Sequence, residues 1–279
     1  MTHEVRSLDQ WGTDQLAAII ARNPVRHCYA ASRLVGRTRG FLRPTHSDLL
    51  GCFEDGRLAS ALVLGANVVP VQTTAATRRE FATALARAGR RCSSIVGPAA
   101  EVLELWTLLE PRWGYARAVR ASQPVMATQQ VPAIAADERV RYAVRSDLDV
   151  VLPACIDMFT SEVGISPVAH GGGPAYRNRI AELIAQRRSL VRIDEGRIVF
   201  KAEVGVIGAG VAQVQGVWVH PDLRGRGLAV PAMAAVVRTI LADIAPTVSL
   251  YVNDFNAAAI ATYRHAGFEQ VDEFATVLF

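Results

Sequence analysis

The sequence predicts a mixed α/β fold, an α+β arrangement built from two related halves. The same pattern (apolar, two acids, Gly, Arg, apolar) occurs at Phe53–Leu58 and again at Ile193–Ile198, each time between apolar runs. Each pattern leads to a helical segment that ends in glycine and an aromatic residue, Gly114-Tyr115 or Gly267-Phe268, and then to a last apolar strand. Because strands and helices do not alternate strictly, we expect a mixed sheet with helices packed on it.

The composition is that of a globular chain. The 279 residues suffice for two domains, and 51% of them are hydrophobic while 20% are charged. No uncharged stretch approaches the ~18 residues of a membrane span, and the start of the chain lacks the basic and apolar segments of a secretory signal. We therefore expect a cytoplasmic protein without a membrane partner.

Charge and cysteine patterns argue against two further classes of protein. The formal net charge is +4, but the arginines are scattered, so neither a basic stripe nor a nucleic-acid partner is predicted. The four cysteines form no C-x-x-C pair and have no histidine at metal-ligand spacing. We expect reduced thiols and no metal site.

In the first half, apolar runs at 49–53 and 58–64 predict a hairpin that turns at Gly56, where glycine accepts a positive φ. A helix should end at Gly114 and be followed by a strand. Residues 129–139 have the polar and proline-containing composition of a linker. The expected domains are residues 1–130 and 139–279.

The second half shows a clearer order of elements. Its predicted strands are 140–144, 190–193, 198–200, 211–219, 248–252 and 271–278, and its predicted helices are 149–159, 176–186, 233–244 and 256–266. The helix at 233–244 has apolar residues at i, i+3 and i+4 spacing, so one of its faces should lie on the sheet. Ser146 and Asp149 offer a capping signal for the first helix, and Gly267 should end the last one.

The most informative segment joins the strand that ends at Val219 to the helix that follows it. The turn between them contains Arg224, Gly225, Arg226, Gly227, Leu228 and Ala229. A glycine-rich turn at a helix N-terminus binds anions, because its backbone N–H groups are unpaired and no Cβ blocks a phosphate. Val230 stands where a dinucleotide fingerprint needs its third glycine, and the lysine of a phosphate-binding P-loop is absent. The turn therefore predicts a pyrophosphate ligand of another kind.

Two motifs resemble those of the GNAT family of N-acetyltransferases. Arg224, Gly227 and Ala229 fit the pattern R/Q-x-x-G-x-G/A. The later segment fits N-x-x-A-x-x-x-Y-x-x-x-G-F at Asn256, Ala259, Tyr263, Gly267 and Phe268. The resemblance covers residues 140–279 and implies a catalytic GNAT domain there.

The first half resembles a domain of unknown function that precedes GNAT modules in some actinobacterial proteins. Together the two resemblances imply tandem GNAT-like domains, of which the N-terminal one is degenerate. Its motif position four residues before Gly114 is Glu110 instead of tyrosine, and residues 71–79 offer no glycine for a phosphate turn. We expect no cofactor in that half.

The family resemblance also implies a reaction. Acetyl-CoA would be the co-substrate, and no metal would be needed. Its pyrophosphate would lie at residues 224–229, and its thioester would meet the backbone of Val217, Trp218 and Val219. Asn253 and Asn256 would lie near the pantetheine arm, and Tyr263 would protonate the departing thiolate.

The resemblance does not identify a general base. The strand position that carries a glutamate in some family members is Gln213. Glu203, Glu162 or a water held by Gln213 and Gln215 could serve, and Glu162 is preferred because the segment between the first two helices lines the acceptor pocket in this family. The acceptor could be a small-molecule amine or a protein amine, and the oligomeric state stays open. The alternative function is a non-catalytic regulatory module that binds acetyl-CoA.

Overall fold

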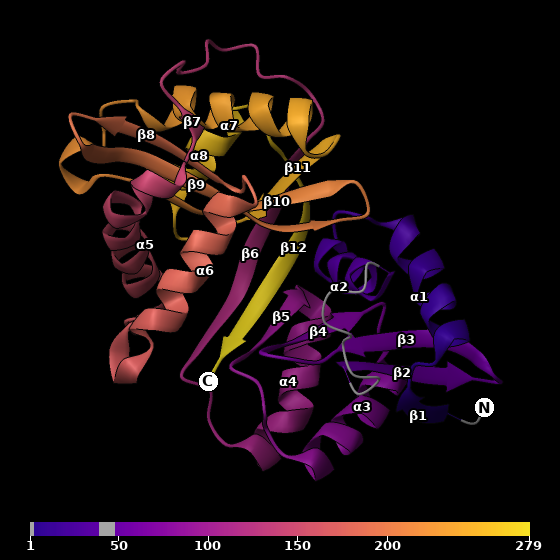
Figure 1. The fold of residues 1–279 in the computed structure, drawn as a ribbon. Helices are drawn as coiled ribbons and strands as arrows, with labels where there is room; N and C mark the ends of the chain where they lie inside the picture. Colours follow the sequence, from indigo (N-terminus) through magenta and orange to yellow (C-terminus); the bar gives the residue numbers. More distant parts are fainter. Residues whose placement is uncertain (1–2, 39–47) are drawn as a thin grey trace.

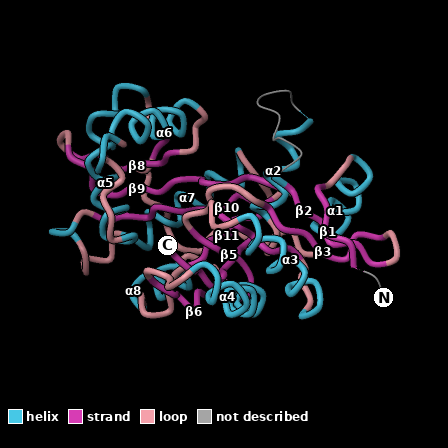
Figure 2. Tube along the Cα trace, turned by 90° about the horizontal axis from the view of Figure 1, so that it is seen from below, coloured by secondary structure: helices cyan, strands magenta, loops and turns pink. Residues whose placement is uncertain are grey.

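The computed structural model describes residues 3–38 and 48–279. Its strands form a 12-stranded sheet in the order β1-β2-β3-β4-β5-β12-β6-β11-β10-β9-β8-β7. Helices cover both faces of this sheet (Figure 2). The pairs β4–β5 and β10–β11 are parallel, whereas the neighbouring pairs are antiparallel, so the predicted mixed sheet is confirmed. Within the described ranges, no helix has the length and apolar composition needed to cross a membrane.

The first half begins with elements that the sequence patterns did not indicate, a strand and two helices. The elements of this half are β1 (His3–Ser7), α1 (Gln10–Arg22), α2 (Cys28–Thr38), β2 (Leu49–Glu54), β3 (Arg57–Val63), β4 (Asn67–Val71), α3 (Ala75–Ala88), β5 (Ser94–Pro98), α4 (Ala99–Trp113) and β6 (Ala118–Thr128). The hairpin at Gly56 is confirmed, with φ of 48° at Asp55 and 81° at Gly56. Its counterpart in the second half has φ of 52° at Glu195 and 73° at Gly196, so both halves use the same left-handed turn.

The second half follows the predicted order. Its elements are β7 (Arg141–Tyr142), α5 (Leu148–Val163), α6 (Gly173–Ala185), β8 (Ser189–Asp194), β9 (Arg197–Gly208), β10 (Val211–Val219), α7 (Ala229–Asp243), β11 (Thr247–Tyr251), α8 (Ala257–His265) and β12 (Glu269–Leu278). The strand expected at 140–144 was predicted too long. The Asp147 carboxylate accepts the Val144 N–H at 2.8 Å and begins a helical turn there, so Ser146 is not the cap.

The two halves exchange their closing strands. The sequence suggests that each half ends in its own strand, but β12 pairs with β5 of the first half, and β6 pairs with β11 of the second. The two exchanged strands also pair with each other, and Figure 1 shows them side by side through the middle of the molecule. Ala275 and Val277 of β12 therefore lie in the core of the first half, while Met126 of β6 lies in the core of the second. An alternating apolar pattern specifies a strand but not its partner.

The predicted linker contains neither helix nor strand from residue 129 to residue 140. It is nevertheless fixed to the second half, because Asp137 pairs with Arg192 of β8 at 2.8 Å, and both side chains are buried. The Asp137 N–H also donates to the carbonyl of Pro231 on α7. The linker is therefore packed on the second half, and the exchanged strands β6 and β12 join the two halves in one sheet.

Candidate functional site

The site is built where two parallel strands of the second half separate. β10 and β11 pair only through residues 211–213 and 247–249. Beyond these pairs, β10 continues to Val219 and β11 to Tyr251. Helices α7 and α8 follow the two separated ends. Ligands of α/β sheets commonly bind outside such carboxyl ends, because the loops that leave them diverge.

A β-bulge lies in β10 just before the residues predicted to meet the thioester. Gln215 is paired with Glu203 and Trp218 with Lys201, so β10 has one residue more than β9 in this interval. Gly216 provides the bulge with φ of +60°. Bulges re-aim the backbone that follows them. Here the backbone concerned is residues 217–219, and Trp218 is fixed by a 2.9 Å bond from its indole N–H to Asp157 of α5.

The predicted phosphate-binding turn is open to solvent. Gly225 and Gly227 both have φ of +74°, and a Cβ on either would meet nothing within 4 Å. The Arg224 Nε donates to the carbonyl of Val219 at 3.1 Å, which fixes the side chain at the end of β10. Leu228 occupies the N-cap of α7, and no side chain of residues 3–38 or 48–279 caps this helix. Its first backbone N–H groups are therefore available to an anion.

The two asparagines occupy different positions in the loop between β11 and α8. Asn256 is the N-cap of α8, since its Oδ1 accepts the Ala259 N–H at 3.2 Å. The Asn253 Oδ1 accepts a hydrogen bond from Gln123 Nε2 at 2.9 Å. Gln123 lies on β6, so a strand of the first half positions a predicted cofactor residue of the second. The sequence analysis missed this partner because it is 130 residues away.

Tyr263 and Glu162 lie on two different helices, α8 and α5. Tyr263 of α8 is 7% exposed and packs edge-on against Phe268, with ring centroids 6.0 Å apart. Burial raises the pKa of its phenol, and the negative charge of Glu162 raises it further. Glu162 ends α5 with its side chain half exposed, and its Oε1 is 3.9 Å from Nη1 of Arg120. The raised pKa keeps the Tyr263 phenol protonated at neutral pH.

Glu203, the other carboxylate considered as a base, is engaged in a buried ion pair. Glu203 is buried on β9, where its Oε1 accepts from Lys201 Nζ at 2.6 Å and from Cys155 Sγ at 3.3 Å. Burial alone would raise the pKa of Glu203, but the ammonium of Lys201 and these hydrogen bonds lower it. Glu203 is therefore a poor proton acceptor. Gln213 is buried on β10, and the side-chain amide of Gln215 lies against Gly205 of β9.

The sequence contains a signal for this ion pair. Lys201 is the only lysine of the chain, and it lies two residues from Glu203 in an otherwise apolar strand. Side chains two apart share one face of a strand. That spacing predicts a buried ion pair under the helices that cover the strand.

The corresponding turn of the first half is filled by a carboxylate. Glu101 of α4 accepts the N–H and the hydroxyl of Thr73 with its Oε2, both at 2.7 Å. Thr74 caps α3 with its own hydroxyl, which accepts the Thr77 N–H. The anion-binding groups that are open before α7 are thus already occupied before α3.

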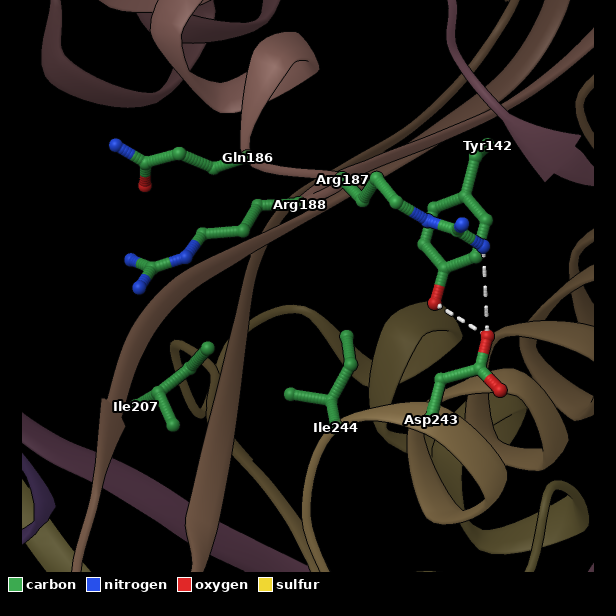
Figure 3. Close-up of a pocket in the computed structure, with 7 residues that line it drawn as sticks. All are labelled: Tyr142, Gln186, Arg187, Arg188, Ile207, Asp243 and Ile244. Atoms are coloured by element: carbon green, nitrogen blue, oxygen red, sulfur yellow. Dashed lines mark hydrogen bonds and ion pairs between the residues drawn. The ribbon is translucent and has the colours of Figure 1, made fainter.

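A separate cavity of about 690 Å³ lies away from this site. Tyr142, Arg187 and Asp243 form one wall, where the Tyr142 hydroxyl donates to Asp243 at 3.0 Å and Arg187 is 3.7 Å from the same carboxylate (Figure 3). This wall includes the C-terminal end of α7, whereas the predicted phosphate turn precedes its N-terminal end. Fifteen helical residues separate the two ends by roughly 22 Å, so this cavity is not part of the candidate site.

Two family models match parts of the chain. Residues 159–268 match the acetyltransferase (GNAT) family, and residues 47–151 match a domain of unknown function, DUF4081. No curated protein matches the chain.

Several solved structures are similar over nearly the whole chain. A GNAT-type N-acetyltransferase from Sphaerobacter thermophilus has 19% identity and a TM-score of 0.61, over 98% of this chain and 94% of that chain. A GNAT-family acetyltransferase from Colwellia psychrerythraea has 12% identity and a TM-score of 0.57, over 99% of both chains. A tandem GNAT protein from the clavulanic acid biosynthesis pathway has 15% identity and a TM-score of 0.55, over 99% of this chain and 98% of that chain. At these identities the likeness shows the fold, which is that of tandem GNAT proteins.

Proposed function

We propose that the GNAT-family domain at residues 159–268 makes this chain an N-acetyltransferase, which moves an acetyl group from acetyl-CoA to a primary amine by direct attack. The acceptor would be a small-molecule amine or a protein amine, and no metal would take part. Cytoplasmic residence, as expected from the sequence, is part of the proposal. The family supports acetyl transfer in general, and the remaining support comes from the open turn and the residues around it.

The open turn before α7 is the observation that carries the proposal. Its glycines have the left-handed conformation of an anion-binding loop, its helix has no side-chain cap, and Arg224 and Arg226 add positive charge. A pyrophosphate held there would direct the rest of a long cofactor toward the separated ends of β10 and β11. In this arrangement the backbone N–H groups at residues 217–219, re-aimed by the bulge, would polarise the thioester carbonyl.

Proton transfer would use two side chains. The attacking amine loses a proton as its nitrogen bonds to the acetyl carbon, and Glu162, directly or through water, would accept it. The bond between that carbon and sulfur breaks, and Tyr263 would donate its proton to the departing thiolate. A phenol with a raised pKa remains protonated at neutral pH, so its proton is present when the thiolate departs.

A second candidate function rests on Gln213. This position offers an amide instead of a carboxylate, and the nearby Glu203 is held by Lys201. A protein that binds acetyl-CoA as a regulatory signal without turning it over would need no base at all. Both candidates require cofactor binding, so only turnover separates them.

The deciding experiment measures release of free thiol from acetyl-CoA across a panel of amines, with Tyr263→Phe beside the natural chain. We expect turnover with at least one amine and a loss of kcat of roughly 10²-fold or more in Tyr263→Phe, with a smaller change in the KM for acetyl-CoA. Tyr142→Phe is the matched control, because its hydroxyl bonds to Asp243 away from the site. Tight acetyl-CoA binding without any turnover would favour the regulatory module, and equal rates in Tyr263→Phe would exclude this tyrosine as the acid.

A further inference from the structure

A second cavity, of about 300 Å³, lies in the first half at the position that corresponds to the candidate site. β4 and β5 are parallel and pair only through residues 67–68 and 94–95 before they separate, as β10 and β11 do. The cavity lies at their separated ends. Its walls come from the C-terminal end of α1 and its connection to α2, from the turn before α3 and from Glu101 of α4.

This cavity does not suit acetyl-CoA. Glu101 occupies the backbone N–H of the turn, and its negative charge would repel a pyrophosphate. The volume equals that of roughly ten molecules of liquid water, which is the lower end of the range for small-ligand pockets and far below the size of the cofactor. A much smaller ligand is required.

Two basic side chains in the wall, the buried His27 and the exposed Arg22, have no partner among the described residues. His27 is only 5% exposed, and its ring nitrogens, which are not among the fully buried atoms without a partner, make no hydrogen bond to a described residue. Burial, followed by the charge of Arg26, lowers the pKa of His27 to about 4, so the ring is neutral and can both donate and accept. Arg22 makes no ion pair within the described ranges, whereas Arg26 is bound to Asp272 through two bonds of 2.5 and 2.8 Å. The His27 ring therefore lines the cavity with nitrogens that water or a ligand can reach.

The carboxylate of Glu101 in the cavity wall uses only one of its two oxygens for hydrogen bonds to Thr73. Glu101 uses Oε2 for both bonds to Thr73, and its Oε1 has no partner among the described residues. As far as the structure describes the chain, the cavity therefore presents the guanidinium of Arg22 without an ion pair, the neutral imidazole of His27 and the acceptor Oε1 of Glu101. A single negative charge matches Arg22, and a hydrogen-bond donor matches Glu101.

We propose that this cavity binds a small carboxylic acid that carries a hydroxyl or amino group beside its carboxylate. Arg22 binds the carboxylate, His27 donates to it, and Glu101 Oε1 accepts from the hydroxyl or ammonium group. The first half thus keeps the location of a GNAT site and uses it for a different and much smaller ligand. This site is independent of acetyl transfer in the second half.

The test is calorimetric titration of the full chain with L-lactate, L-serine, propionate and ethanolamine. We expect lactate, serine or both to bind at least tenfold more tightly than propionate, which lacks the donor, and than ethanolamine, which lacks the carboxylate. Lactate and serine separate a hydroxy acid from an amino acid. If neither binds, or if propionate binds equally well, the proposal is wrong.

Substitutions of arginine test whether the acid binds in the cavity of the first half. Arg22→Gln should weaken the preferred acid at least tenfold, and Arg22→Lys should restore part of the loss. Arg87→Gln removes the same charge at the exposed C-terminal end of α3, far from the cavity, and should change nothing. Arg224→Ala, in the proposed phosphate turn of the second half, should also leave binding of the acid unchanged. Binding in the first half can then be judged whether or not the chain transfers acetyl groups. Undiminished binding by Arg22→Gln would contradict the assignment.

Discussion

The ion pair of Lys201 and Glu203 is the residue-scale feature with the largest energetic consequence. Both side chains are buried, so each charge depends on the other for stabilisation. Lys201→Met leaves an unpaired buried carboxylate and should lower the free energy of unfolding by about 3–5 kcal/mol in denaturant titrations. The double variant Lys201→Met/Glu203→Leu should recover most of that loss. If the double variant is as unstable as the single one, packing of the lysine stem and not charge is responsible.

The ion pair of Lys201 and Glu203 also predicts that the free energy of unfolding falls at acid pH. The pKa of Glu203 is lower in the folded chain than its ordinary value of 4.5, so its contribution is present above that value and is lost as the pH falls through the folded pKa. Glu203→Gln should therefore flatten the decline in unfolding free energy below pH 4.5. If the unfolding free energy of Glu203→Gln declines as steeply below pH 4.5 as that of the natural chain, other carboxylates are responsible for the decline.

Arg224 and Arg226 permit a test of the phosphate turn. Replacing either by alanine should weaken acetyl-CoA binding about tenfold, because a charge-assisted hydrogen bond contributes about 1.5–3 kcal/mol. Affinity should also become less dependent on salt, since fewer screened charges remain. The control is Arg238→Ala, which removes an exposed arginine of α7 that pairs with Glu138. Titration calorimetry at two salt concentrations measures both effects, and unchanged affinity would place the pyrophosphate elsewhere.

At the scale of elements, the bulge in β10 connects the buried pair to the site. A Cβ on Gly216 would lie 3.2 Å from Lys201 Nζ and 3.1 Å from Met158 Cε, and its φ of +60° disfavours any side chain. Gly216→Ala should therefore cost about 1–2 kcal/mol or more in stability and also lower kcat/KM, because the backbone at residues 217–219 shifts. Gly210→Ala has a similar positive φ but no contact closer than 3.7 Å, so it should lose stability alone. If kcat/KM falls equally in Gly216→Ala and Gly210→Ala, the bulge has no specific role in catalysis.

At the scale of the molecule, the exchanged strands make the second half depend on the first. A chain that begins at residue 140 lacks β6, so β11 and β12 each lose a neighbour and Met126 leaves the core. This fragment should aggregate or fail to bind acetyl-CoA, whereas one that begins at residue 118 should bind more tightly, since it keeps Gln123 beside Asn253. Circular dichroism and titration with acetyl-CoA compare the two. Full binding by the shorter fragment would show that β6 is dispensable.

Local sequence determined most elements and the outline of the site. Glycine positions fixed the two hairpin turns and the open turn before α7, because few other residues accept a positive φ. Periodicity placed α7 on the sheet, and the asparagine before α8 was recognisable as its cap. These features depend on neighbours within a few residues, which a single sequence displays.

Only the tertiary structure decided which distant residues meet. It paired β12 with the first half and β6 with the second, joined Gln123 to Asn253, and placed a carboxylate of α4 in the turn before α3. It also showed that Glu203 is held by Lys201, which leaves Glu162 as the less encumbered carboxylate. Strand partners and buried ion pairs depend on packing between segments far apart in the chain, and an apolar strand pattern fits several partners equally well.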